Sequence, residues 1–443
     1  MKWKSVLRPR LRLVTIAGAL VIPAVVWAQA QTAQVIAVRA GRVFDPRSGT
    51  NVTNQVVLVT GERISDAGPA DRVQIPAGAR VIDLSQATVL PGLIDGHLHL
   101  TDAAGGLQHQ MMLALYSATQ SLNAGFTTQV VMGSHGGGYA DVELRKAIES
   151  RLVRGPRLLV AGPVLDITTP GNDTFPLDFK PFRPNIVANG PEAMRAAVRE
   201  LAHYGVDHIK MTTTGPFVFK PNGDMVNQAL PSLEELKAAV DEAHRRGLFV
   251  ATHSYGGDGL KWALEAGVDD IQHAVAADDA DIKMFLQKNL PVTATILDMR
   301  QDEPGDLRRF APHSRWRLME QTWKKMLAAG VRLGFGSGAA PPPGRVFNQV
   351  CNCSHGVQAE MFPIFVQWGA TPVYTLRMAT TVNAAIIRMQ DSVGTIEKGK
   401  YADLIAVAGD PLQDITEMQR VTFVMKGGEV VRNDVAARAM SSR

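Results

Sequence analysis

The strongest constraint on the fold is a regular alternation of short apolar segments and amphipathic helical patterns between residues 91 and 390. Helical patterns such as Ser232–Arg246 and Asp278–Lys288 begin at residues that favour helix N-caps. Short runs rich in apolar and β-branched residues between such helices predict parallel strands. The eight predicted strands are Leu93–His97, Thr127–Met132, Arg157–Val164, His208–Met211, Leu248–His253, Asp270–His273, Val292–Ile296 and Val331–Phe335. Eight such units predict an α/β fold, a (β/α)8 TIM-type barrel.

The segments on either side of the barrel, residues 31–90 and 391–443, have a different pattern. Both contain short Val- and Ile-rich runs separated by Gly and Asp turns, such as Val56–Val59 and Ala402–Val407. Because the ends of a domain often lie close together, we expect the two segments to form one small composite β-sandwich. Residues 91–390 then form the barrel domain.

Residues 1–30 have the pattern of a secretory signal peptide. An apolar run, Leu13–Val26, follows a cluster of basic residues and precedes small residues at Ala28 and Ala30. The run is short for a membrane span, although an uncleaved anchor is the alternative. We expect cleavage after Ala28 or Ala30, a periplasmic or secreted mature protein, and no stable association with the membrane after cleavage.

Composition excludes some partners and leaves others open. Without the basic N-terminus the net charge of +4 becomes near neutral, and no basic stripe interleaved with aromatic residues exists, so we expect no nucleic-acid partner. The two cysteines, Cys351 and Cys353, are one residue apart, and a disulfide between them would be strained. Free thiols, a labile redox pair or a soft metal contact remain open.

Polar residues at the ends of the predicted strands indicate where chemistry takes place, because barrel enzymes carry their active sites at the carboxyl ends of the strands. Alternate residues of a strand face the same side, so His97 and His99 can grip one cation together. A buried Lys210 is costly unless it is neutralised or modified. Each residue alone is commonly a hydrogen-bonded core residue, and a structural barrel without metal is the alternative. Five such residues at the ends of the barrel strands together favour a metal site: His97, His99, Lys210, His253 and His273.

Two longer motifs carry a resemblance to a known family. The segment from Val89 to Leu100, VLPGLIDGHLHL, resembles the first-strand signature of the amidohydrolase superfamily, and GTIEKGKYADL at residues 394–404 resembles its C-terminal hallmark. The lysine-bearing fourth strand and Thr252–Gly256 are similar to the imidazolonepropionase-like group. That group includes Xaa-Pro dipeptidases, carboxypeptidase-like enzymes and ochratoxin-hydrolysing amidohydrolases. The resemblance covers essentially the whole chain after residue 30.

The resemblance implies two divalent metal ions, with zinc preferred and manganese or cobalt as alternatives. His97 and His99 would bind the more buried ion, and His253 and His273 the more exposed one. A carboxylated Lys210 would bridge the two ions, and a hydroxide formed between them would be the nucleophile. The implied reaction is hydrolysis of an amide or peptide-type C–N bond in a small substrate, a dipeptide or an N-acyl amino acid. A lactone or carbamate is the alternative substrate, and the family's habit of association implies a homo-oligomer.

One position departs from the family pattern. An aspartate normally follows the eighth strand, where it binds the buried ion and carries a proton to the leaving amine, but this chain has Gly338. One interpretation is a catalytically impaired or non-catalytic metal- or ligand-binding homologue. The other is that the loop after Pro341 supplies a replacement, although a purely structural lid is equally consistent. The candidate replacements are Cys351, Cys353, His355 and Glu360.

The remaining assignments concern the substrate. Tyr255, two residues after His253, is predicted to donate a hydrogen bond to the polarised carbonyl oxygen. His135, in a glycine-rich loop after the second strand, is predicted to stabilise an oxyanion or bind substrate, and Arg300 to hold a substrate carboxylate. Solvation and a surface salt bridge are the ordinary alternatives for His135 and Arg300. The predicted catalytic side chains are Lys210, His273, Tyr255 and His135.

Overall fold

The computed structural model describes seven stretches of the chain: residues 34–101, 106–168, 185–296, 314–341, 345–346, 349–350 and 354–435. The predicted signal peptide lies outside the described residues, as do Arg300, Cys351 and Cys353. No described helix has both the length and the apolar character needed to cross a membrane.

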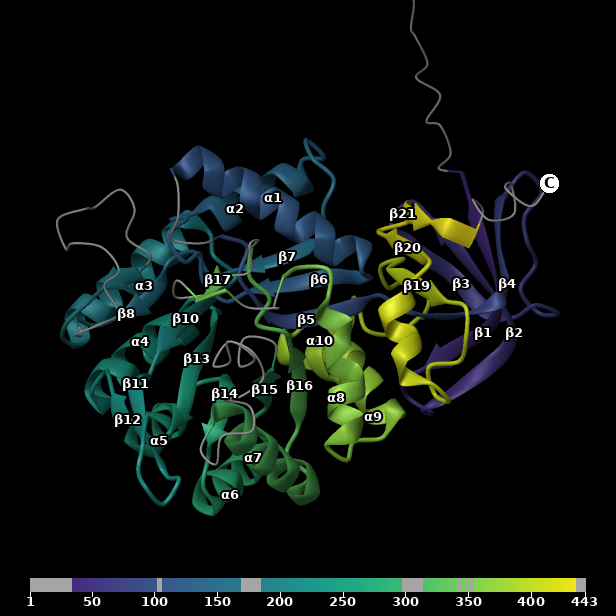
Figure 1. The fold of residues 1–443 in the computed structure, drawn as a ribbon. Coiled ribbons are helices and arrows are strands. Elements are labelled where there is room, and N and C mark those ends of the chain that lie inside the picture. Colours follow the sequence, from purple (N-terminus) through teal and green to yellow (C-terminus); the bar gives the residue numbers. More distant parts are fainter. Residues whose placement is uncertain are drawn as a thin grey trace, which may run out of the picture. The chain divides into compact units, whose positions relative to one another are not determined.

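The terminal segments join in one sheet, ordered β21-β20-β19-β4-β1-β2-β3 (Figure 1). Its strands are β1 (Ile36–Asp45), β2 (Thr50–Thr60), β3 (Arg63–Pro69), β4 (Arg80–Pro91), β19 (Leu404–Val407), β20 (Phe423–Lys426) and β21 (Glu429–Asn433). The sheet curls back on itself, since Ala402 N donates to Glu62 O and Gly399 N to Ile64 O. Apolar residues of both terminal segments, such as Val38 and Phe423, form its own core. The expectation that the two terminal segments join in one separate β structure is confirmed.

The barrel strands follow in chain order and pair in parallel. They are β5 (Leu93–Leu98), β6 (Phe126–Val131), β7 (Arg157–Val160) with β8 (Val164–Asp166), β10 (His208–Thr212), β13 (Phe249–Gly256), β14 (Asp270–Ala276), β15 (Val292–Thr295) and β16 (Leu333–Gly336). A bridge between Leu98 and Ala339 joins the first strand to the end of the last. The predicted (β/α)8 fold is confirmed, with the third strand interrupted at Gly162, which has a φ of 65°.

Helices cover the outside of the barrel (Figure 1). They are α1 (Leu107–Asn123), α2 (Ala140–Glu149), α3 (Pro191–Tyr204), α4 (Leu233–Arg245), α5 (Gly257–Ala266), α6 (Asp279–Lys288), α7 (Arg315–Ala329), α8 (Met361–Gln367), α9 (Pro372–Arg377) and α10 (Asn383–Ile386), with a π-helical turn, η4 (Met378–Val382). Ser232 caps α4 and Asp278 caps α6, each through a reciprocal capping box, as the sequence predicted.

Shorter elements complete the described chain: β9 (Asn185–Val187), the hairpins β11 (Thr214–Phe219) with β12 (Met225–Ala229) and β17 (Arg345–Val346) with β18 (Gln349–Val350), and the 3-10 turns η3 (Gln358–Glu360) and η5 (Ile415–Arg420).

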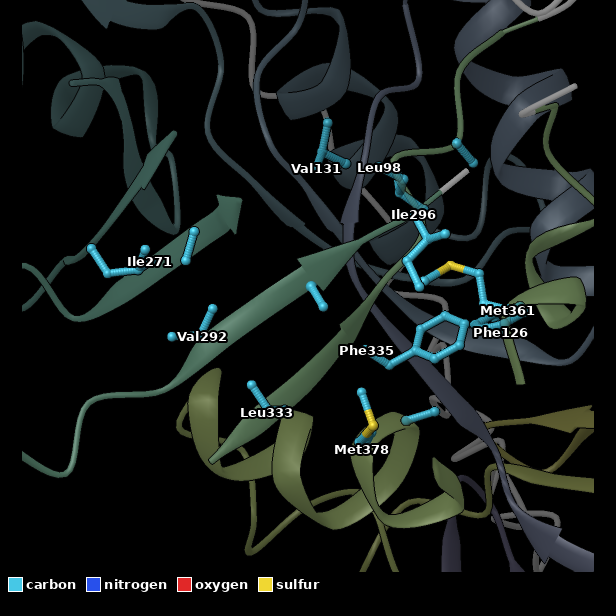
Figure 2. Close-up of a cluster of buried hydrophobic side chains, with 14 of the residues drawn as sticks. Leu98, Phe126, Val131, Ile271, Val292, Ile296, Leu333, Phe335, Met361 and Met378 are labelled. Carbon is cyan, nitrogen blue, oxygen red and sulfur yellow. The ribbon is translucent and has the colours of Figure 1, made fainter. Parts of the chain in front are cut away.

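An apolar core between the strands and the helices holds the barrel strands in place. Figure 2 shows apolar side chains of β14, β15 and β16 together with Met361 and Met378 from the helical segments that follow. Phe335 faces this core, with its ring 5.5 Å from that of Phe126. Its neighbours Gly334 and Gly336 face inward, where a Cβ on Gly336 would lie 2.8 Å from the Cβ of His97. Glycine at 336 therefore leaves room for the histidine.

Candidate metal centre

The five predicted ligands converge at the carboxyl end of the barrel strands, and none is more than 9% exposed except His253, which is half-buried. His97 lies on β5, His99 directly after it, Lys210 on β10, His253 on β13 and His273 on β14. Their rings form a chain of neighbours: the ring centroids lie 5.1 Å apart for His97 and His99, 4.9 Å for His97 and His273, and 4.5 Å for His273 and His253.

Lys210 lies among these histidines. It is 3% exposed. Burial lowers the pKa of each of the four ring systems well below the usual value, and the Lys210 ammonium lowers each of them further. The charge of Lys210 therefore acts on both histidine pairs. Lys210 precedes by two residues Thr212, whose partner in the sheet is His253.

The first pair, His97 and His99, has its tautomers fixed by neighbouring acceptors. The Nδ1 atom of His99 lies 3.1 Å from Gly133 O, which only accepts, so Nδ1 carries the hydrogen. The Nδ1 atom of His97 lies 2.6 Å from Gln272 Oε1. Gln272 donates through Nε2 to Oδ2 of Asp270, so its own oxygen accepts from His97.

As a result, both Nε2 atoms present lone pairs, and these two atoms lie 3.2 Å apart. Two nitrogens that bind one zinc ion at about 2.0–2.1 Å in tetrahedral geometry lie roughly 3.3 Å apart. Two lone pairs at this distance repel each other unless a cation lies between them. The donor set and its spacing therefore fit one divalent ion at this pair.

The second pair, His253 and His273, has different support. The Nδ1 atom of His273 lies 2.5 Å from Thr295 Oγ1 on β15. His273 and Ala274 have positive φ angles, 77° and 48°. Because Asp270 and Gln272 face the barrel interior, strict alternation would turn His273 outward toward the helices. The left-handed backbone at these two residues explains why His273 nonetheless faces His97 and His253.

In the described part of the chain, no three His, Cys, Asp or Glu side chains group closely enough to hold an ion. This agrees with the ligand set that the family resemblance implies, in which each ion would take two histidines and an oxygen of a carboxylated Lys210. An unmodified lysine offers an ammonium instead of an oxygen. The third ligand of each ion would appear only after carboxylation.

Position 338 lies where the sequence motif predicts it. Gly338 N donates to His97 O at 2.7 Å, and His99 N donates to Ala339 O at 2.8 Å. The backbone of residue 338 therefore adjoins the first histidine pair, and the φ of Gly338 is 67°. Asp95, absent from the predicted site, holds this turn. It accepts from Ser337 N at 2.9 Å and Ser337 Oγ at 2.5 Å, and burial raises its pKa to about 6.

The structure does not bring His355 to the site as a proton acceptor, which corrects one candidate replacement for the aspartate. Its Nε2 donates to the backbone oxygen of His99 at 2.9 Å. Its Nδ1 lies 2.8 Å from Ser121 Oγ. Both ring nitrogens are therefore already bonded, and burial lowers the pKa of His355 to about 4. His355 supports the backbone beneath His99. Glu360 lies at the end of η3 and is half-buried.

Two predicted substrate residues lie beside the ligands. The ring centroid of Tyr255 is 4.5 Å from that of His253 and 5.4 Å from that of His273. His135 is half-buried, its ring centroid lies 3.9 Å from that of His99, and burial lowers its pKa to about 4. Each therefore lies against a different histidine pair.

The predicted clamp Arg300 lies outside the described residues, but another arginine reaches the site. Arg315, the first residue of α7, donates from Nη1 to Tyr255 Oη at 2.7 Å. Its charge lowers the pKa of both His253 and His273. Sequence reasoning missed Arg315 because it begins a helix and ends no strand.

Known proteins share this architecture. The model of the amidohydrolase family matches residues 88–431. Ochratoxinase from Aspergillus niger is 25% identical, with 91% of this chain and 88% of that protein covered. A solved Xaa-Pro dipeptidase with methionine bound in its active site has a TM-score of 0.76 and 27% identity, covering 90% of this chain and all of that one. A prolidase complexed with N-methylphosphonate-L-proline has a TM-score of 0.77 and 29% identity, with the same coverage.

Proposed function

The chain belongs to the amidohydrolase family and is a hydrolase of carbon–nitrogen bonds, and we propose that it is an exported, metal-dependent amidohydrolase acting on a dipeptide or an N-acyl amino acid. The observation that carries the metal dependence is the pair of unprotonated Nε2 atoms 3.2 Å apart at His97 and His99. The similarity to a dipeptidase, a prolidase and an ochratoxinase supports an amide bond within a small substrate.

The nitrogen donors of the two histidine pairs fit two divalent ions, of which zinc is preferred. His97 and His99 would hold one, His253 and His273 the other, and a carboxylated Lys210 would serve both. Ions bound in this way lower the pKa of a water molecule and polarise a carbonyl group. Carboxylation would also remove the cost of a buried ammonium beside two cations, because it converts Lys210 into an anion.

The chain's own groups then orient the substrate. Tyr255 would donate a hydrogen bond to the carbonyl oxygen as that oxygen gains negative charge. His135, beside His99, would contact the substrate on the opposite flank. With Gly338 in place of an acid and His355 fully bonded, the proton for the leaving amine would come from Cys351, Cys353 or Glu360.

The test is turnover by the metal-loaded mature protein on Xaa-Pro, Xaa-Arg/Lys and N-acyl amino acid panels. Release of an amino acid from at least one panel is expected, together with loss of release when a chelator removes the ions. A protein that binds two ions and hydrolyses no amide on these panels contradicts the proposal. That outcome favours the second candidate, an impaired binding homologue, whose support is glycine at the position adjoining His97.

Export has a separate test. When the full-length gene is expressed in a bacterial host, we expect the protein in the periplasmic or secreted fraction with Gln29 or Gln31 at its N-terminus. N-terminal sequencing that finds Met1 on the exported protein, or a protein confined to the cytoplasm, contradicts this part of the proposal. Its failure leaves the catalytic part unaffected.

A further inference from the structure

Three side chains from separate elements meet on the His253–His273 side of the site. Phe217 comes from the β11–β12 hairpin, Tyr255 from β13 and Arg315 from the first turn of α7. The rings of Phe217 and Tyr255 pack edge to face with centroids 5.8 Å apart. The guanidinium carbon of Arg315 lies 5.2 Å from the centroid of Phe217 and 5.9 Å from that of Tyr255.

The hydrogen bond within this cluster has a fixed direction. A guanidinium only donates, so Tyr255 Oη is the acceptor in its 2.7 Å bond to Arg315 Nη1. The hydroxyl hydrogen of Tyr255 is then directed to another acceptor. A tyrosine that accepts from a cation is also a stronger donor, because the charge stabilises electron density drawn onto its oxygen.

Packing restricts the positions of the Tyr255 and Arg315 side chains. Tyr255 is 5% exposed, and its backbone nitrogen donates to Thr214 Oγ1 at 3.0 Å, which ties β13 to the start of the hairpin. Phe217 covers one face of the guanidinium, so Arg315 gains a cation–π contact that favours its observed position. The hairpin thus holds the backbone and the ring of Tyr255, and α7 contacts its hydroxyl.

We propose that Arg315 is a positioning residue that sets Tyr255 as the hydrogen-bond donor to the carbonyl oxygen of the substrate, with Phe217 holding the guanidinium in place. This inference rests on the proposed function. Arg315 acts through the tyrosine, so its contribution exists only while the Tyr255 hydroxyl is present.

The kinetic test is a double-mutant cycle on an N-acyl amino acid and its C-terminal amide. Removal of one oxyanion donor costs about 10²–10³-fold in kcat. Tyr255→Phe should show a loss of that order, and Arg315→Met a loss of about 10-fold or more, mainly in kcat and equal for both substrates. In the Tyr255→Phe background, Arg315→Met should change kcat less than about threefold. Arg315→Lys, which keeps a charged donor, should recover part of the loss.

A spectroscopic arm does not depend on turnover. The ¹³Cζ resonance of Tyr255, identified by its absence from Tyr255→Phe, should move in Arg315→Met. It should stay unchanged in Arg317→Met, which removes an exposed arginine of the same helix. If the wild type hydrolyses nothing while this resonance moves as expected, the proposed function fails and the Arg315–Tyr255 pair stands.

Two results would overturn the inference. One is an unchanged Tyr255 resonance in Arg315→Met. The other is a loss that persists undiminished in the Tyr255→Phe background and disappears with the amide substrate, since that pattern means that Arg315 binds the substrate carboxylate directly.

Discussion

The two histidine pairs of the candidate metal centre are built in different ways. The β5 pair, His97 and His99, comes from one tripeptide whose backbone bonds to the turn after β16. The β13–β14 pair, His253 and His273, joins two strands at a register irregularity between Ser254 and Gly256. Only the second pair includes a residue with a left-handed backbone, at His273.

The difference shows where the centre stores strain. A non-glycine residue held in the left-handed region costs on the order of 1–3 kcal/mol and persists only where its surroundings demand it. At His273 the left-handed backbone turns the side chain to the barrel interior. Regular alternation after Asp270 and Gln272, which face the interior, would turn it outward. The β5 pair also lies at a register irregularity, between Asp95 and Leu98, but backbone bonds to the turn after β16 hold it. The β13–β14 pair instead depends on side chains from β15, the β11–β12 hairpin and α7. We expect the first pair to be the more rigid.

The largest expected effect comes from Lys210, which under the proposed function would serve both pairs. Lys210→Ala should remove both equivalents of metal and reduce turnover by at least about 10²–10⁴-fold, the range for loss of an essential catalytic group. Metal content by elemental analysis and turnover on the best panel substrate would be measured on the same preparation. Retention of one full equivalent would show that one pair holds its ion without the lysine, which would separate the pairs functionally.

The second effect concerns pH. Burial raises the pKa of Asp270 to about 7 from an ordinary value of 3.8, so the folded state favours the protonated carboxyl. The stability that this group contributes is present below about pH 4 and is lost as the pH rises through 7, roughly 4 kcal/mol in all. In metal-free protein, urea unfolding from pH 4 to 8 should show this decline, and Asp270→Asn should lack it.

Asp141 provides the matched control for this measurement. It is equally buried, its pKa is raised to about 6, and it lies on α2, where it accepts from Gly162 N. Asp141→Asn should remove a comparable pH dependence and leave metal affinity unchanged. Identical pH profiles for wild type and Asp270→Asn would contradict the first expectation.

Most of the fold was predictable because its determinants are local. Strand ends, capping residues and the His97-Leu98-His99 spacing are properties of short segments, and the structure brings the five predicted ligands together. Gln272 and Asp95 were missed although each lies within two residues of a predicted ligand, because their partners, His97 and Ser337, are far away along the chain. For His273 the inward orientation was predicted but its left-handed backbone was not, since strict strand alternation would turn this side chain outward.

The third effect tests the link between the two pairs. Gln272, on β14, accepts from His97 Nδ1 and donates to Asp270, so it fixes the tautomer of a ligand in the other pair. Gln272→Leu should lower the affinity for the more buried ion by about 10- to 100-fold, as loss of other groups that orient metal ligands does. Gln129→Leu is the control, because Gln129 is equally buried but bonds to Ala118 O behind β6. Equal metal affinity in both variants would mean that His97 keeps its tautomer without Gln272.

The smallest expected effect concerns the glycine beside the β5 pair. The backbone of residue 338 adjoins that of His97, and aspartate tolerates a φ of 67° better than most residues. If Cys351, Cys353 or Glu360 already supplies the proton, Gly338→Asp should change turnover by less than about tenfold. In that case alanine at the true substitute should cost about 10²–10⁴-fold. A gain of tenfold or more in Gly338→Asp, with no loss from any of the three alanine variants, would instead identify the natural chain as an impaired homologue. Gly338→Asn separates charge from bulk, because it has nearly the same size and cannot accept a proton at neutral pH.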